Sequence, residues 1–124
     1  MSRPAGLHLP LSTAILLSIS LLSGCHSYHI DATIENRTGA PIQLLEVDYP
    51  AASFGADSLS VGADFHYQFQ VHGSGQLKLS YTTPNGQTVQ ISGPPLVERQ
   101  QGLLEIVLEP GGNAQFHFQL TAPA

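Results

Sequence analysis

An alternation of large apolar and polar side chains runs through Asp64-Phe65-His66-Tyr67-Gln68-Phe69-Gln70-Val71-His72. Successive side chains of a β-strand point to opposite faces of a sheet, so this stretch predicts a strand with one apolar and one polar face. A glycine-containing turn, residues 73–75, separates it from a second alternating run over residues 76–82. The two runs together predict a β-hairpin.

The same period of two residues recurs from residue 28 to residue 122. Alternating runs occupy residues 28–35, 42–49, 89–91, 103–109 and 115–120, and turn-forming Gly, Pro and Asn residues separate them. Within residues 42–49 the phase slips at Leu44-Leu45, which predicts a β-bulge or a strand covered on both faces. The residues Gly93-Pro94-Pro95 are expected to end the strand that begins near residue 89.

Short strands about ten residues apart are typical of a sandwich of two sheets. We therefore expect an all-β fold, an antiparallel immunoglobulin-like β-sandwich of about seven strands, or eight if residues 58–61 also pair. A small barrel is the alternative architecture.

An apolar segment over residues 7–22 precedes this domain and ends at Leu22-Ser23-Gly24-Cys25. A basic residue near the start, an apolar stretch and small residues at its end form the layout of a secretory signal. The ending resembles the lipobox of bacterial lipoproteins, in which the chain is cut before the cysteine and the cysteine is lipidated. The alternative is an uncleaved membrane-spanning helix. A span needs about 20 mostly apolar residues, whereas this segment is only marginally long enough and is interrupted by polar residues and Pro10.

The lipobox resemblance implies a signal-peptide helix over residues 1–24, a lipidated Cys25 with a short tether over residues 25–27, and a sandwich domain over residues 28–122. His26 follows the cysteine, where lipoproteins retained in the inner membrane carry aspartate, so the resemblance favours the outer membrane, facing the periplasm. Three extended residues reach only about 10 Å, which keeps the domain close to the membrane surface. The domain itself resembles small immunoglobulin-like envelope lipoproteins, a resemblance that implies no particular activity.

The charge balance excludes one class of partner. The chain carries 4 basic and 9 acidic residues, and without the signal peptide the net charge changes from −5 to −6. An acidic surface repels phosphate backbones, so no nucleic acid is expected as a partner. Cys25 is the only cysteine, and its lipidation would leave no thiol for a disulfide, a nucleophile or a metal site.

The sequence offers two groups of candidate binding residues. His66 and His117 are weak candidates for a metal site if their strands are neighbours; otherwise both are solvated surface side chains. The stretch 49–59 is predicted as a loop that meets a partner, through Tyr49, Pro50, Ser53 and Phe54. The alternative is that Phe54 folds back over one end of the core.

These observations lead to a functional expectation. No nucleophile paired with a base and no cofactor motif occurs in the sequence, so we expect neither an enzyme nor a bound cofactor. We expect a lipid-anchored envelope protein that acts as a non-catalytic binding or interaction module for another envelope protein. A lipoprotein that binds a metal or a small ligand is the alternative.

Overall fold

Eight strands make up the part of the chain that the computed structural model describes, residues 28–123. The expectation of an all-β domain is confirmed, and no helix occurs within these residues. The strands are β1 (Ile30–Asn36), β2 (Ile42–Tyr49), β3 (Ala52–Leu59), β4 (Asp64–Phe69), β5 (Gly75–Thr82), β6 (Thr88–Leu96), β7 (Gln101–Glu109) and β8 (Asn113–Thr121).

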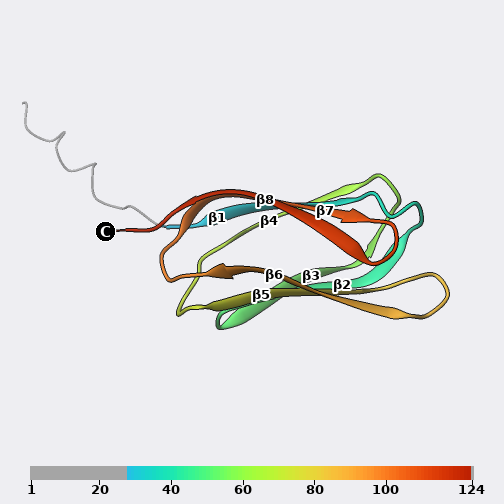
Figure 1. Cartoon of the computed structure of the whole chain (residues 1–124), viewed down its shortest axis with the longest axis horizontal. Coiled ribbons are helices and arrows are strands. Elements are labelled where there is room, and N and C mark those ends of the chain that lie inside the picture. Colours follow the sequence, from blue (N-terminus) through green and yellow to red (C-terminus); the bar gives the residue numbers. More distant parts are fainter. Residues whose placement is uncertain (1–27, 124) are drawn as a thin grey trace, which may run out of the picture.

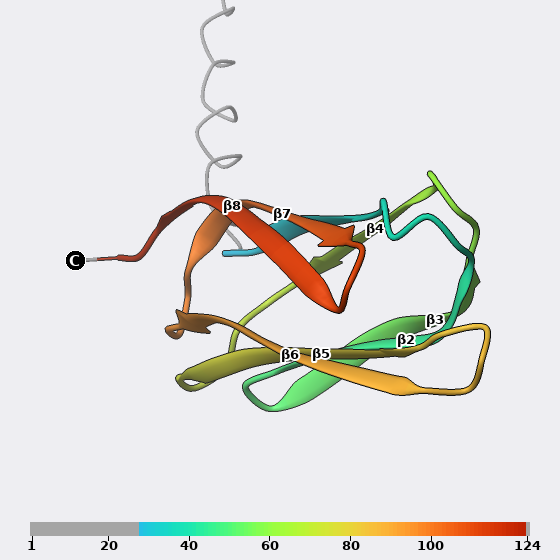
Figure 2. The same ribbon diagram turned by 45° about the vertical axis from the view of Figure 1, so that its right-hand side comes forward.

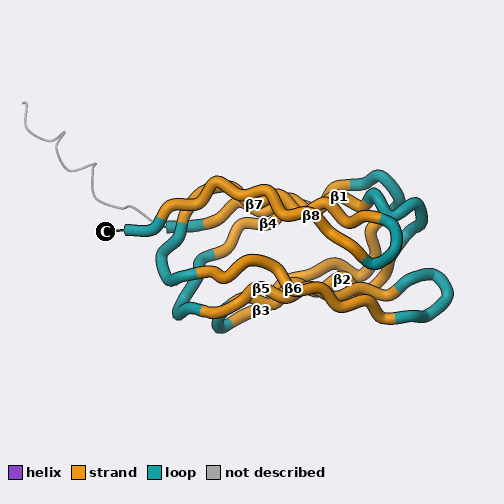
Figure 3. Tube along the Cα trace, in the orientation of Figure 1, coloured by secondary structure: helices purple, strands orange, loops and turns teal. Residues whose placement is uncertain are grey.

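The strands form two four-stranded sheets that lie face to face as the layers of a sandwich (Figures 1 and 3). One sheet has the strand order β4-β1-β7-β8 and the other has the order β3-β2-β5-β6. The alternate apolar residues of each strand meet between the layers, as the period of two predicts. The buried core consists of Ile30, Ala32, Ile34, Ile42, Leu45, Val47, Phe54, Leu59, Phe69, Val71, Leu77, Leu79, Tyr81, Leu96, Leu104, Ile106 and Leu108.

The first strand lies inside its sheet and has a neighbour on each side. β1 runs antiparallel to β4, with Ile30 opposite Phe69, and parallel to β7, with Ile30 opposite Gly102. The prediction of a purely antiparallel sandwich is therefore wrong for the pair β1 and β7. Parallel neighbours need a long connection, and here the chain builds the whole second sheet between them.

The hairpin predicted over residues 64–82 does not form. β4 pairs with β1, whereas β5 pairs with β2 and β6, so the chain crosses from one sheet to the other between them. Val71 lies in this crossing and is 2% exposed. Because Val71 is buried between the layers, the connection joins the two sheets, and the first strand ends at Phe69 rather than at His72.

β6 continues past the point where the sequence predicts its end. Pro95 lies opposite Gln76 of β5, and Leu96 is fully buried in the core. Proline lacks the N–H that a ladder needs, which edge strands tolerate because one side of an edge strand is unpaired. Figure 2 shows β6 and β8 along the same side of the sandwich, one in each layer.

The predicted signal-peptide helix, Cys25 and the tether lie outside the described residues. Within residues 28–123, no helix is long and apolar enough to cross a membrane. The described chain begins and ends at the same end of the sandwich (Figure 1), because Ile30, Gly102 and Leu120 share one row of the sheet.

Candidate functional site

The stretch predicted as a partner loop is a strand of a hairpin. β2 and β3 join through Pro50-Ala51, with Tyr49 opposite Ala52 and with Ala51 at φ 77°. The prediction of a loop is wrong because Phe54 and Leu59 are buried, which holds the segment against the core as an edge strand. It is this strand, and not residues 58–61 alone, that brings the number to eight.

Five aromatic rings close the sandwich where the edge strands β3 and β4 meet. We call this group the aromatic seam; it comprises Tyr49, Phe54, Phe65, Tyr67 and Phe69. Tyr49 and Phe69 have ring centroids 4.3 Å apart, and the rings of Phe54 and Tyr67 are stacked at 4.4 Å. Stacked and tilted pairs at these distances are favourable beyond the area that they bury. The seam therefore joins the two sheets at this side.

The seam accounts for two of the four residues predicted to meet a partner. Phe54 is 7% exposed and packs on the four other rings of the seam. It therefore covers the core, as the alternative interpretation predicts. Burial raises the pKa of Tyr49, and the neighbouring Tyr67 adds to this shift, so the Tyr49 hydroxyl keeps its proton. Of the four, Ser53 is exposed and Pro50 is half-buried at the turn.

An exposed leucine, Leu44, lies within this hairpin, on the outer face of β2. The β-bulge predicted at Leu44-Leu45 is present, since the pairing of β2 with β5 shifts between Gln43 and Glu46. The bulge holds Leu44 at φ 52° and leaves its side chain 64% exposed. A left-handed backbone conformation destabilises any residue other than glycine by about 1–2 kcal/mol. Leu44 is therefore strained, although its side chain contributes little buried area to the domain.

Leu44 borders a shallow groove of about 660 Å³ that follows the hairpin. Leu45, Glu46, Ser53, Gly55 and Asp57 also line it. Gly55 is required there, because a Cβ atom at this position would lie inside contact distance of the Leu45 carbonyl oxygen. Of the four predicted partner residues, Ser53 and Phe54 line this groove, and Ser53 is the exposed one of the two.

Two acidic side chains, those of Glu46 and Asp57, line the groove, and Asp48 lies near Glu46. Glu46 and Asp48 lie on the same outer face of β2, and a hydrogen bond to Asp48, together with the charge of Asp48, raises the pKa of Glu46. Lys78 of β5 lies opposite Asp48, and no ion pair forms between them. An apolar side chain among carboxylates presents a mixed surface to a partner.

The two candidate metal ligands do not meet. His66 lies on β4 and His117 on β8, the opposite edges of one sheet, and one row of the sheet runs from His66 through Thr33 and Glu105 to His117. Three strand spacings separate the histidines by about 14 Å, whereas each ligand must lie about 2 Å from a zinc ion. The hypothesis of a metal site shared by these residues is therefore wrong.

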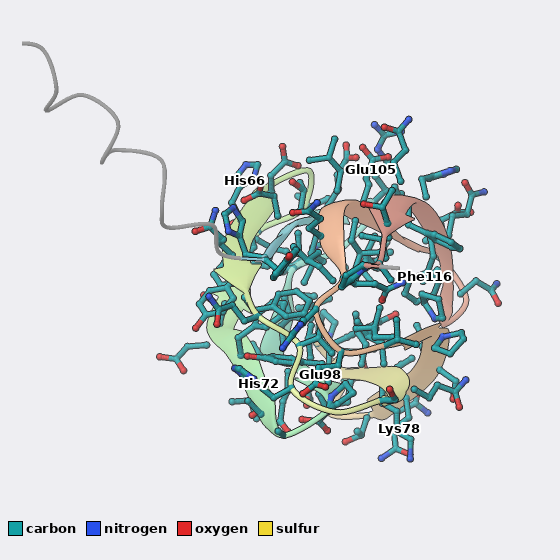
Figure 4. All side chains as sticks on the ribbon, turned by 90° about the vertical axis from the view of Figure 1, so that its left-hand side faces the viewer. His66, His72, Lys78, Glu98, Glu105 and Phe116 are labelled. Atoms are coloured by element: carbon teal, nitrogen blue, oxygen red, sulfur yellow. The ribbon has the colours of Figure 1, made fainter. Side chains whose placement is uncertain are left out.

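Each histidine has a polar neighbour on the outer face instead. His66 Nδ1 lies 3.1 Å from Thr33 Oγ1, and His117 Nε2 lies 3.2 Å from Gln115 Oε1. Figure 4 shows His66 and Glu105 pointing away from the core, whereas Phe116 points between the layers. Among residues 28–123, no three His, Cys, Asp or Glu side chains gather closely enough to hold a metal ion.

Sequence reasoning found the bulge but missed the exposure of Leu44. A leucine pair inside an alternating strand forces one of the two side chains outward, and this signal was available in the sequence. The sequence contains no such signal for Tyr67 and Phe118, which are 43% and 54% exposed. Their exposure follows from their places on edge strands.

The described part of the chain thus defines an all-β sandwich domain. No protein-family model and no curated protein sequence matches the chain. Among solved structures it is similar to the NMR structure of a protein from Eubacterium rectale, with a TM-score of 0.54 and 13% sequence identity over 77% of this chain and 94% of that chain. At this identity the similarity concerns the fold alone.

Proposed function

We propose that this protein is a lipid-anchored component of a bacterial cell envelope whose sandwich binds another envelope protein without catalysing a reaction. The anchor is Cys25, and the location is the outer membrane on its periplasmic side. The lipobox resemblance of residues 22–25 supports the anchor. The surface around Leu44 supports the binding role.

The conformation of Leu44 is the observation that carries the binding role. An exposed side chain gains nothing from the core, and glycine would fit the left-handed backbone without strain. Compared with glycine, leucine at position 44 therefore lowers the stability of the isolated domain. Strain of this kind is compensated when the side chain is buried by a partner, which would contribute about 1.5–3 kcal/mol.

The surroundings of Leu44 define the chemistry of the partner. The groove would receive an apolar side chain against Leu44, and the carboxylates of Glu46 and Asp57 at its border favour a basic group beside it. We therefore propose a protein segment that pairs an apolar with a basic side chain.

The binding role is tested with Leu44→Gly in the full-length chain, using in-cell crosslinking to measure the yield of partner adducts. We expect the yield to fall about tenfold or more, since the lost burial exceeds about 1.4 kcal/mol. The matched control is Arg99→Gly, which relieves a similar φ of 64° at another exposed position. Both variants should melt at a higher temperature, but only Leu44→Gly should lose the adduct. Equal yields from both variants would refute the role of this surface.

The anchor is tested separately with Cys25→Ala. The wild-type chain should incorporate labelled palmitate and sediment with membranes, and the variant should do neither, because two or more acyl chains are needed for stable anchoring. An unlabelled wild-type chain would remove the anchor from the proposal and leave the Leu44 surface unaffected.

A further inference from the structure

The last strand of the sandwich has one free edge. β8 pairs with β7 along its whole length, from Asn113 opposite Glu109 to Thr121 opposite Gln101, and it ends the sheet. An edge strand of nine residues presents a row of unpaired N–H and C=O groups that another strand can complete.

β8 differs from the three other edge strands of the described domain. β4 has only six residues and carries Asp64, and β3 carries Asp57. β6 contains Pro94-Pro95, which cannot continue a ladder. Charge, shortness and proline are the features that protect edges from pairing, and β8 has none of them.

The sequence of β8 is symmetric about its own midpoint. His117 is the central residue of Asn113–Thr121, and Gln115-Phe116-His117-Phe118-Gln119 has the same order in both directions. We propose that β8 pairs antiparallel with β8 of a second copy of this chain, across a two-fold axis at His117. In this register Gln115 lies opposite Gln119 of the second copy, Phe116 opposite Phe118, and His117 opposite His117.

The side chains suit this arrangement on both faces of the sheet. Phe118 is 54% exposed at the rim of the core, and Phe116 beside it packs near Gly93 of β6. Pairing would place each Phe118 against a Phe116, the kind of aromatic cross-strand contact that stabilises antiparallel sheets. On the outer face, Gln115 and Gln119 are uncharged amides that donate to and accept from one another.

Charge explains why the second copy would approach at this edge. The chain is acidic, so two copies repel each other over most of their surface. Asn113–Thr121 contains no Asp, Glu, Lys or Arg, and the nearest carboxylates on its outer face, those of Glu105 and Glu109, lie one strand away on β7. With a two-fold axis, the β8 edge of each copy is paired with that of the other, so the assembly closes as a dimer.

The dimer is tested by cysteine scanning in the full-length chain under mild oxidation. Directly opposed residues of antiparallel strands have Cβ atoms about 4.5–5.5 Å apart, within reach of a disulfide after a small adjustment. His117→Cys alone should give a disulfide dimer of twice the mass. Gln115→Cys and Gln119→Cys should each give only background, since four residues along the strands separate the two copies of each cysteine by about 13 Å. The two variants expressed together should crosslink with each other.

Controls distinguish this pairing from collision and from the binding role of Leu44. The wild-type chain, with Cys25 alone, and His66→Cys, on the same face at the opposite edge, should show only background dimer. Phe118→Lys added to His117→Cys should abolish most of the dimer, whereas Val61→Lys, equally exposed at 54%, should not. Leu44→Gly should leave the dimer band unchanged, because Leu44 lies on the other sheet.

Three results would overturn the proposal. The first is a His117→Cys dimer no stronger than that of His66→Cys. The second is a Gln115→Cys or Gln119→Cys dimer as strong as that of His117→Cys, which means another register or random collision. The third is a His117→Cys adduct of a mass other than twice the chain, which assigns the edge to a different protein.

Discussion

A single buried amide ties together the end of the sandwich opposite the chain termini. Asn36 is fully buried at the end of β1, and its Nδ2 donates to the carbonyl oxygens of Ala40, Leu59 and Ser60 at 2.9, 3.0 and 3.2 Å. Its Oδ1 accepts from the backbone N–H and the hydroxyl of Thr38. The residue thereby joins the β1–β2 turn to the end of β3 in the other sheet.

Asn36→Ala should lower the free energy of unfolding by about 2–4 kcal/mol, since buried carbonyls and the Thr38 N–H lose a partner. Asn36→Asp should cost more at pH 7, because an ionised oxygen replaces the donor and faces three carbonyl oxygens. That environment raises the pKa of the introduced carboxyl group. Its destabilising effect therefore shrinks as the pH falls through the raised folded pKa and is smallest below the unfolded value of about 3.9.

Urea unfolding of the two variants at pH 7 and at acidic pH measures this difference. Asn85→Asp, at an exposed position where Oδ1 accepts from the Thr83 hydroxyl, is the control and should be close to neutral at both pH values. If Asn36→Asp were as stable as the wild type at pH 7, the donor role of Nδ2 would be wrong.

The local sequence pattern predicted the positions of several strands and the bulge in β2, but it did not predict which strands pair. The alternation over residues 64–72 identified β4, and the phase slip at Leu44 identified the bulge, because each depends on neighbouring residues alone. The partner of β4 is β1, more than 25 residues away in sequence, and no local signal distinguishes it from β5. The segment 52–59 was missed for a related reason: Gly55, Ala56 and Ser53 resemble a loop, and only burial of Phe54 and Leu59 makes it a strand.

Glycines inside three strands allow this pairing to be tested. An added Cβ at Gly55 meets the Leu45 carbonyl, and at Gly75 it meets only Pro50 Cγ at 3.4 Å. At Gly93 it meets Leu77 Cδ2 at 2.7 Å and the ring of Phe116 at 2.9 Å. Gly55→Ala must move backbone and should cost about 3 kcal/mol, and Gly75→Ala should be near neutral. Gly93→Ala must move both the Leu77 side chain and the Phe116 ring and should cost about 2 kcal/mol. Thermal unfolding ranks the three variants. A Gly55→Ala variant as stable as Gly75→Ala would contradict the close approach of β2 and β3.

The strand order makes the two sheets depend on each other. β1 requires β4 on one side and β7 on the other, and the chain between β1 and β7 includes all strands of the second sheet. Neither half of the sequence can therefore complete a sheet by itself. The free edge of β8 also follows from the strand order, so it could not be predicted from the local sequence pattern.

This interdependence predicts that the domain unfolds in one step, although it has two sheets. Leu79→Ala removes a core side chain from β5 and Ile106→Ala removes one from β7, at 2% and 0% exposure. Each should lower the free energy of unfolding by about 2–5 kcal/mol through lost burial and the cavity left behind. Far-ultraviolet circular dichroism reports on both sheets. Once the other three tyrosines, Tyr28, Tyr49 and Tyr67, are replaced by phenylalanine in every protein compared, the fluorescence of buried Tyr81 reports on the second sheet. If the sheets share one core, both signals shift to the same midpoint in each variant, because loss of either layer exposes the apolar face of the other. A Leu79→Ala variant whose tyrosine signal melts before its circular dichroism would mean that the second sheet unfolds separately, and the single-core account of this fold would be wrong.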